Sequence, residues 1–269
     1  MIGADAPFNL QPASRLSSQV STHLVFLLFV AGAVYAQALT GFALTLILLG
    51  LIGATNLVPL TDAVNASTVV GFCTAWTFLY RRRPLTFQRV LVPTIVASAI
   101  GTLAGAVLLT WLADTAYQAL RFILGGSIVA CALLLWRTAQ PLPTLSSARA
   151  YAVTGGISGL MAGMFSAPGP PLVYLLYRQP MPLERIQEAL MLIFGLGTAL
   201  RLLIVVPTGQ FSGLSLQLAI EALPVVILVT GYAARHRPPL SPRLFKALIC
   251  LLLVGTGISM GASALVAML

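Results

Sequence analysis

Eight long apolar runs follow one another along the chain, and most of them are long enough to cross a lipid bilayer. A membrane-spanning helix needs about 20 predominantly apolar residues. The runs cover residues 22–53, 63–80, 90–112, 117–136, 150–177, 184–206, 213–232 and 244–268. Only 8% of the 269 residues are charged, which is too few to give a soluble domain of this size a hydrated surface. The sequence therefore predicts an all-α polytopic membrane protein.

Basic residues lie mostly between the apolar runs. The formal net charge of +9 would suggest a polyanionic partner in a soluble protein. Between apolar runs, Lys and Arg instead mark the cytoplasmic connections. The connections near 54–62, 113–116 and 207–212 carry no Lys or Arg, so we expect them outside. Four connections carry basic clusters: Arg81, Arg82, Arg83 and Arg89; Arg137 and Arg149; Arg178 and Arg185; and Arg235, Arg237, Arg243 and Lys246.

The run at 150–177 is interrupted by SAPGPP, residues 166–171. If this run crossed the bilayer, Arg178 and Arg185 would fall outside, and so would the basic cluster at 235–246. If it enters and leaves on the cytoplasmic side as a re-entrant hairpin, all four basic clusters fall inside. We therefore expect the Pro-Gly break at a hairpin tip near the middle of the membrane.

The run at 22–53 has a break of its own, around Thr40, Gly41 and Phe42. Each broken run is followed by a Pro-Leu start and three further runs, so the chain reads as two related halves. One hairpin and three crossings make an odd number of passages, which predicts that the second half is inverted relative to the first. The expected fold is two inverted repeats, each a broken or re-entrant helical hairpin plus three transmembrane helices. Eight simple spans with kinked helices remain the alternative.

The predicted organisation begins with a polar N-terminal tail at 1–21, which lacks the basic n-region of a signal peptide. Repeat 1 covers 22–137, a cytoplasmic linker covers 138–149, and repeat 2 covers 150–269. The broken segments are 22–53 and 150–177. The predicted spans are 63–80, 90–112 and 117–136 in repeat 1, and 184–206, 213–232 and 244–268 in repeat 2.

Two breaks at membrane depth point to a shared cavity. Non-helical backbone is tolerated there only where protein or water pairs its polar groups. The helix arm after each break exposes N-terminal amides at its positive end, which favours a bound anion. The alternative is that Gly and Pro only allow close helix packing. The candidate binding residues at the breaks are Gln37, Thr40, Gly41, Phe42, Ser166, Ala167, Pro168, Gly169 and Pro170.

Polar residues in two other runs extend this candidate site. Asn65 and Thr68 share one helical face, and Gln187, Thr198 and Arg201 can share another. Polar side chains inside a membrane face the bundle interior, which makes Asn65, Gln187 and Arg201 substrate-binding candidates. Because Arg201 lies close to the uncharged loop at 207–212, an outward-reaching side chain with no substrate role is the alternative.

Glu221 is an acidic residue well inside an apolar run. It lies about 12 Å along the helix from Gly213, close to the membrane midplane. Three roles fit it: a proton carrier, an ion-pair partner of Arg201, or a protonated structural group.

No catalytic triad, metal cluster, phosphate loop or nucleotide fingerprint is visible in the sequence. We therefore expect no enzyme activity, no cofactor, no metal and no nucleic-acid partner. The expected partners are a small anion and the lipid bilayer, and a homodimer remains open.

The stretches ALTGFAL, GLMAGMFSAPGPPLVYLL and EALMLIFGLGTALRLL resemble the sulfite exporter (TauE/SafE) family of bacterial membrane transporters. The resemblance covers the chain from about residue 24. Gly41 and Phe42 match the family's Gly-Phe-Gly motif, with Ala43 in place of its second glycine. Gly169, Pro170 and Pro171 match the Gly-x-Gly-Gly-Pro-Pro motif, with Ser166 and Pro168 in place of glycines. Pro168 removes a backbone N–H donor, which the Ser166 hydroxyl can replace.

The resemblance implies export of sulfite or an organosulfonate such as sulfoacetate across the bacterial inner membrane. The two halves of such a transporter would move so that a central site opens alternately to either side of the membrane. Proton-coupled uptake of a small anion is the runner-up, and an anion channel or a non-transporting membrane subunit is the third alternative.

Overall fold

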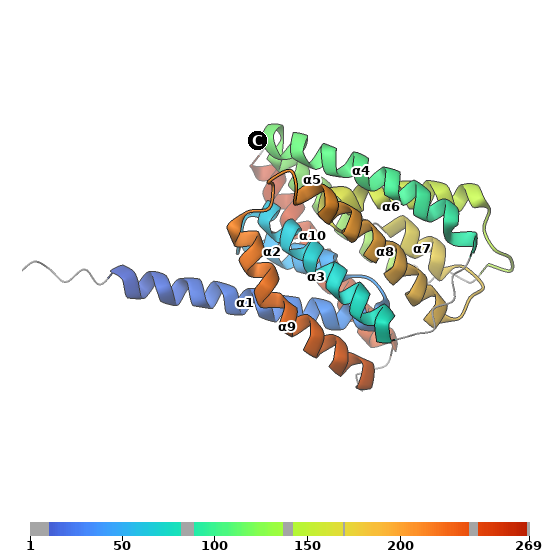
Figure 1. Cartoon of the computed structure of the whole chain (residues 1–269), viewed down its shortest axis with the longest axis horizontal. Coiled ribbons are helices and arrows are strands. Elements are labelled where there is room, and N and C mark those ends of the chain that lie inside the picture. The colour runs from blue at the N-terminus through green and yellow to red at the C-terminus, as the bar shows by residue number, and fades with distance from the viewer. Residues whose placement is uncertain (1–10, 82–88, 137–141, 169, 237–241, 268–269) are drawn as a thin grey trace, which may run out of the picture.

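The structure of the protein is a computed structural model that describes residues 11–81, 89–136, 142–168, 170–236 and 242–267. Within these ranges the elements are α-helices and one 3₁₀ turn, which confirms the all-α fold (Figure 1). They are α1 (Gln11–Thr40), α2 (Leu44–Thr55), α3 (Leu60–Arg81), η1 (Arg89–Leu91), α4 (Val92–Thr115), α5 (Tyr117–Trp136), α6 (Ala148–Phe165), α7 (Pro170–Tyr177), α8 (Leu183–Val205), α9 (Gly213–Arg235) and α10 (Pro242–Val266).

The helix bounds follow the apolar runs, with two differences near polar segments. Helix α1 begins at Gln11, within the polar N-terminal tail predicted at 1–21, so the described part of that tail is helical. Its Ser and Gln residues are polar, but they are compatible with a helix. Helix α6 begins at Ala148, inside the predicted linker, because the Ser147 side chain caps it by accepting a hydrogen bond from the Ala150 N–H.

Both broken runs contain the predicted interruption. Helix α1 ends at Thr40, and Gly41 and Ala43 adopt positive φ angles of 81° and 85° before α2 begins. Helix α6 ends at Phe165, where Ser166 has a φ of 53°. Helix α2 packs against α1, and α7 packs against α6. Each broken run therefore forms a helical hairpin.

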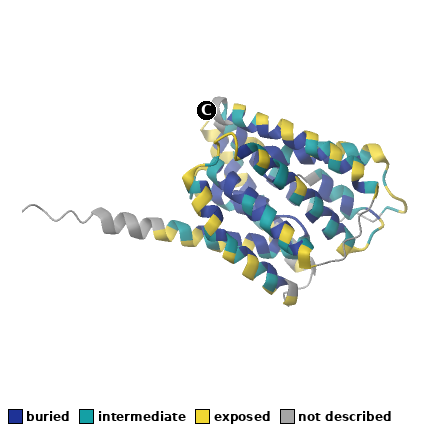
Figure 2. Ribbon diagram, viewed as in Figure 1, coloured by how far each residue is buried: buried dark blue, intermediate teal, exposed yellow. Residues whose placement is uncertain are grey.

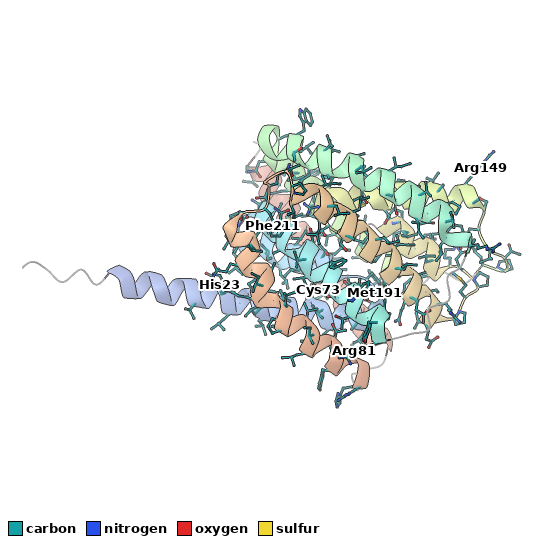
Figure 3. The ribbon with its side chains drawn as sticks, in the orientation of Figure 1. His23, Cys73, Arg81, Arg149, Met191 and Phe211 are labelled. Atoms are coloured by element: carbon teal, nitrogen blue, oxygen red, sulfur yellow. The ribbon has the colours of Figure 1, made fainter. Side chains whose placement is uncertain are left out.

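The helix ends gather at two opposite ends of the bundle. Arg81 and Arg149 lie toward one end, and Phe211, in the uncharged α8–α9 connection, lies toward the other (Figure 3). We call the second end, whose connections carry no Lys or Arg, the uncharged end. Helix α1 enters from this end, and α10 finishes there (Figure 1). The structure therefore separates the basic connections from the uncharged ones as the sequence predicts. Arg82, Arg83, Arg137 and Arg237 lie outside the described residues.

Residues beside the two breaks contact α8 at different levels. Gly41 packs against the backbone and side chain of Gln187, near the start of α8. Gly163, three residues before Ser166 of the second break, contacts the Arg201 side chain near the end of α8. These α8 positions are 201 − 187 = 14 residues apart, a rise of about 21 Å along the helix. That the tips face each other near the membrane midplane stays a prediction.

Helix pairing repeats between the two halves of the chain. Helix α4 packs on α6, and α9 packs on α1; α3 packs on α9, and α8 packs on α4. The pairs α3–α8 and α5–α10 join equivalent helices of the two halves. Exchanging α1–α5 with α6–α10 therefore reproduces these pairs of neighbours.

Glycines bring α4 and α6 into close, parallel contact. A Cβ atom added to Gly155 would lie 2.8 Å from the Thr94 Cα atom, and one added to Gly159 would lie 2.6 Å from the Ser98 Cα atom. Both positions thus require glycine, because two backbones approach here as in other tightly packed membrane helices. This packing fixes the arm that carries the second break.

The outer surface of the bundle is suited to lipid. Leu203, Leu228 and Leu251 are more than 70% exposed, and apolar side chains face outward on most helices (Figure 2). By length and composition, four described segments can span a bilayer: Val20–Thr40, Arg89–Leu112, Leu183–Val205 and Gly213–Ala233. Helix α3 does not meet this criterion, because it carries many polar residues, most of them buried in the bundle. The chain is a membrane protein.

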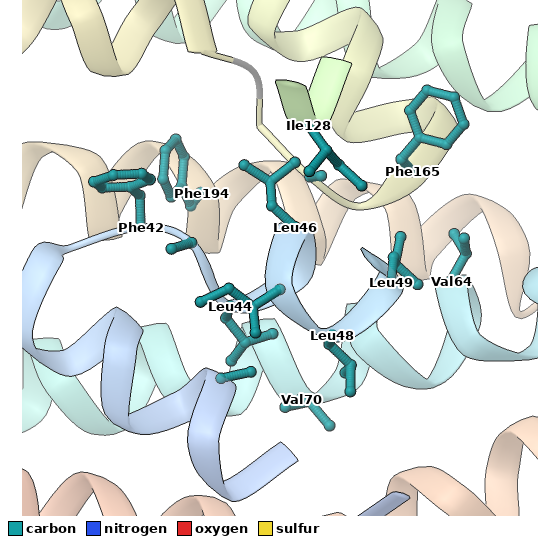
Figure 4. Close-up of a cluster of buried hydrophobic side chains, with 14 of the residues drawn as sticks. Phe42, Leu44, Leu46, Leu48, Leu49, Val64, Val70, Ile128, Phe165 and Phe194 are labelled. Carbon is teal, nitrogen blue, oxygen red and sulfur yellow. The ribbon is translucent and has the colours of Figure 1, made fainter. Parts of the chain in front are cut away.

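Helix α2 lies in the middle of the apolar core. Its Leu44, Leu46, Leu48 and Leu49 side chains are almost fully buried, with Phe42 and Phe165 toward the two ends of the cluster (Figure 4). The short arm of the first hairpin is therefore a core element, which holds the first break in position.

Candidate functional site

Arg201 is the largest fully buried side chain of the described structure, with 1% of its surface exposed. Its Nε atom donates to the Gly163 carbonyl oxygen at 2.9 Å. Its Nη1 atom donates to the Thr68 hydroxyl at 2.5 Å, and its Nη2 atom donates to the Asn65 Oδ1 atom at 3.1 Å. The alternative of an outward-reaching Arg201 is wrong. The side chain turns inward because α3 and α6 offer acceptors there.

These three acceptors are neutral. The ion pairs found among the described residues join His23 to Glu221 and Arg185 to Glu188, so Arg201 has no carboxylate partner there. A guanidinium carries five N–H donors, of which these hydrogen bonds use three. Burying a cation without a counter-charge is costly, and three neutral acceptors offset this cost only in part. The arrangement leaves positive charge and donor capacity available to an anion.

Asn65 and Thr68 hold Arg201 from α3, one turn apart. The Thr68 hydroxyl accepts from Arg201 and donates to the Val64 carbonyl oxygen at 2.8 Å. The Asn65 amide donates from Nδ2 to the Gln210 carbonyl oxygen at 2.8 Å. The structure therefore brings Asn65 and Arg201 together, as part of one cluster that also reaches the α8–α9 connection.

A second polar cluster surrounds the first break. Gln187 Nε2 donates to the Leu39 carbonyl oxygen at 2.9 Å, and Tyr177 donates its hydroxyl to the Thr40 carbonyl oxygen at 2.5 Å. Tyr177 also meets the Phe42 ring edge-on, with centroids 6.1 Å apart. The buried Gln37 side chain lies 3.4 Å from the Met191 sulfur (labelled in Figure 3). Gln37, Thr40, Gly41, Phe42 and Gln187 thus come together near the basic end.

At the second break, Ser166 is the main polar side chain. It is 1% exposed, and its hydroxyl has no hydrogen-bond partner among the described residues. Ala167 is buried, Pro168 is half-buried and Pro170 begins α7. Gly169 lies outside the described residues. An unpaired buried hydroxyl is costly, so Ser166 is a donor available to a ligand.

Glu221 pairs with His23 and not with Arg201. The ion pair with Arg201, one of the three roles considered for Glu221, is therefore wrong. Its Oε2 atom lies 2.6 Å from His23 Nδ1, and its Oε1 atom accepts from Gln217 at 3.0 Å. The two side chains are 31% and 21% exposed, respectively, between α9 and α1. His23, which the sequence analysis did not consider, therefore belongs to this group. Its position near the start of an apolar run was the available signal.

Arg121 is a further residue that sequence reasoning missed. Its Nη2 atom contacts the Gly53 carbonyl oxygen at 3.2 Å, Asn56 Oδ1 at 3.1 Å and Ser263 Oγ at 3.3 Å. A cation at the end of α2 stabilises the negative end of the helix dipole. A basic residue inside an apolar run was the signal, and the role found is to hold α2 against α5 and α10.

Comparison with known proteins shows the family of the chain. The sequence profile described as "Sulfite exporter TauE/SafE" matches residues 24–260. The chain belongs to the sulfite exporter TauE/SafE family. It is also 31% identical, over 230 residues, to a protein of Cupriavidus necator named "Probable sulfite/organosulfonate exporter TauE". That alignment covers 84% of this chain and 88% of the relative. No solved structure matches the chain.

Two departures from the TauE/SafE glycine motifs have a structural consequence. Ala43 and Ser166 stand where the family motifs have glycine, and both keep a positive φ, at 85° and 53°. A residue with a Cβ atom is disfavoured in this region. Both residues thus adopt a backbone conformation that glycine would adopt at a lower cost.

Proposed function

We propose that the protein exports a small sulfur-containing anion, sulfite or an organosulfonate such as sulfoacetate, across the bacterial inner membrane. The observation that carries the proposal is Arg201, a buried guanidinium with neutral acceptors and no carboxylate partner among the described residues. The unused N–H donors of a guanidinium match two oxygens of a sulfite or sulfonate group. The family and the name of the Cupriavidus necator relative supply the substrate class.

The two polar clusters along α8 would serve as successive stations for the anion. Gln37, Thr40 and Gln187 form the cluster nearer the basic, cytoplasmic end, and Arg201 forms the one nearer the uncharged end. Two repeats that swap the same helix neighbours are the arrangement expected for alternating access by inverted repeats. Export of one negative charge is favoured by about 2.3 kcal/mol per 100 mV of inside-negative potential, so it needs no coupling ion.

The direct test is efflux of radiolabelled sulfite or sulfoacetate from proteoliposomes. We expect saturable efflux that is faster than from protein-free vesicles and that is strongly reduced in Arg201→Gln. Arg185→Gln, on the same helix but paired with Glu188 near the surface, is the control and should keep most of the activity. If neither anion leaves faster than from protein-free vesicles, the substrate assignment is wrong.

The His23–Glu221 pair favours a second candidate, proton-coupled uptake. A carboxyl group 2.6 Å from an imidazole can exchange a proton with it, at a position between two packed helices. Inward flux that depends on pH, and loses this dependence in Glu221→Gln, would support uptake. An unchanged pH dependence would remove Glu221 as a proton carrier.

A channel or a non-transporting subunit makes a different prediction. Only a carrier exchanges labelled external anion for unlabelled internal anion in a saturable counterflow. We expect such counterflow with sulfite, and its absence alongside rapid efflux would indicate a channel. A homodimer stays a prediction, which the mass of the purified protein in detergent tests.

A further inference from the structure

The connection between α8 and α9, residues Val206–Ser212, crosses the uncharged end of the bundle close to Arg201. We call it the outer loop. Its residues are exposed except for Phe211, which is half-buried. Two side chains of α3, Asp62 and Asn65, hold it in place. Neither was assigned such a role by the sequence.

Asp62 ties the end of the outer loop to the first turn of α3. Its carboxylate accepts hydrogen bonds from the Ser212 hydroxyl and, at 2.7 Å, from the Ser215 hydroxyl. Ser212 is also the N-cap of α9, because its Oγ atom accepts from the Ser215 N–H at 2.9 Å. A charge-assisted bond to a capping residue fixes both the loop end and the start of α9.

Asn65 ties the middle of the outer loop to Arg201. Its Nδ2 atom donates to the Gln210 carbonyl oxygen at 2.8 Å, while its Oδ1 atom accepts from Arg201 at 3.1 Å. One amide therefore contacts both the buried cation and the loop above it. An anion on the unused Arg201 donors draws the guanidinium toward itself and away from Asn65 Oδ1, and a rotation of the freed amide then releases Gln210.

We propose that the outer loop is the gate at the uncharged end of the transporter, and that Asp62 and Asn65 are positioning residues that keep it closed until an anion engages Arg201. This inference rests on the proposed function for its substrate, and it is supported by the burial of Arg201 and by the two contacts of α3 with the outer loop. Thr208, in the same loop, donates instead to the Ile204 and Val205 carbonyl oxygens at the end of α8.

The test measures access to the site from outside. Thr198 lies one turn from Arg201 on α8, is 4% exposed and bonds only within its own helix in the described structure. A Thr198→Cys reporter is made in a background with Cys73, Cys131 and Cys250 replaced by Ala. Right-side-out vesicles are treated with a membrane-impermeant methanethiosulfonate that carries a sulfonate group, and the labelling rate is measured.

We expect Asp62→Asn and Asn65→Ala to raise the labelling rate about tenfold, the change expected from losing one hydrogen bond that holds the closed state. Thr208→Ala, in the same loop but without a bond to α3, is the matched control and should leave the rate unchanged. The double variant Ser212→Ala, Ser215→Ala removes the partners of Asp62 without altering α3 and should reproduce the Asp62→Asn effect. Equal rates in all these variants would overturn the gate.

Added sulfoacetate, which unlike sulfite does not react with a methanethiosulfonate, separates this proposal from the proposed function. Sulfoacetate that raises labelling in the reporter protein, but not in its Asn65→Ala form, supports coupling through Asn65; an equal response of both forms overturns that coupling. If sulfoacetate has no effect on either form while the loop variants still raise labelling, the gate is supported and sulfoacetate is not the substrate.

Discussion

Asn65 Oδ1 lies 3.1 Å from Arg201 Nη2, although 136 residues separate the two along the chain. The contact joins α3 of the first half to α8 of the second, and α6 completes it through the Gly163 carbonyl oxygen. A buried guanidinium is thus shared by both halves of the protein. This placement suits a site whose access changes when the halves move relative to each other.

Arg201→Lys should abolish most transport while keeping the charge. A lysine ammonium cannot satisfy acceptors in three directions at these distances, and it lacks the planar fork that matches an oxyanion. Loss of one charged hydrogen bond costs about 1.5–3 kcal/mol, so we expect kcat/KM for efflux to fall at least about tenfold. Proteoliposome kinetics measure this effect. Arg185→Lys is the control, and equal losses in both variants would argue against a specific role for Arg201.

Tyr177→Phe should destabilise the first break. The variant keeps the edge contact with Phe42 but removes the hydroxyl that donates to the Thr40 carbonyl oxygen at 2.5 Å. An unpaired carbonyl group in a partly buried position costs about 1–3 kcal/mol. Unfolding of the purified protein in detergent should show this loss. Tyr174→Phe, whose hydroxyl only accepts a 3.3 Å bond from Arg178, should change stability much less.

Gly159→Ala should disrupt the packing of α4 on α6, because its Cβ atom would lie 2.6 Å from the Ser98 Cα atom. Backbone atoms cannot move aside as a flexible side chain does, so we expect a loss of about 1–3 kcal/mol. Gly156→Ala, on the same helix, adds a Cβ atom whose nearest neighbours are 3.9 Å away and should be tolerated. Comparable thermal stability of the two variants would contradict the close approach.

The sequence was sufficient to predict the helices and their breaks, because apolar length and Gly or Pro interruptions are local properties. The run at 117–136 coincides with α5, Tyr117–Trp136. The charge pattern also placed the basic connections at one end, since each cluster adjoins a single helix end. The helix at residues 11–21 was not predictable in this way, because polarity argues against a membrane span but does not exclude a helix.

The partners of the site residues were not predictable from spacing. Arg201 is buried because Thr68 and Gly163 approach from other helices, and a helical face on α8 alone cannot indicate this. Glu221 was recognised as unusual, but its partner His23 is 198 residues away. The α8 residues that lie beside each break, Gln187 and Arg201, were not predictable from spacing either, because they depend on how the hairpin arms pack against α8.

Ala43→Gly should be tolerated, and this variant should be more stable than one with a glycine substitution elsewhere in the same hairpin. Ala43 has a φ of 85°, a conformation that costs a residue with a Cβ atom about 1–2 kcal/mol and costs glycine little. This relief offsets the loss of one buried methyl group, which is about 0.8 kcal/mol.

The control is Ala36→Gly. Ala36 lies in the last turns of α1 and, like Ala43, is 5% exposed. There the substitution loses the methyl group and also costs about 0.5–1 kcal/mol of helix stability. Unfolding in detergent should therefore separate the two variants by about 1.5–3 kcal/mol in favour of Ala43→Gly. If both lose the same stability, the positive φ at Ala43 imposes no cost, and the glycine of the family motif at this position must serve another purpose.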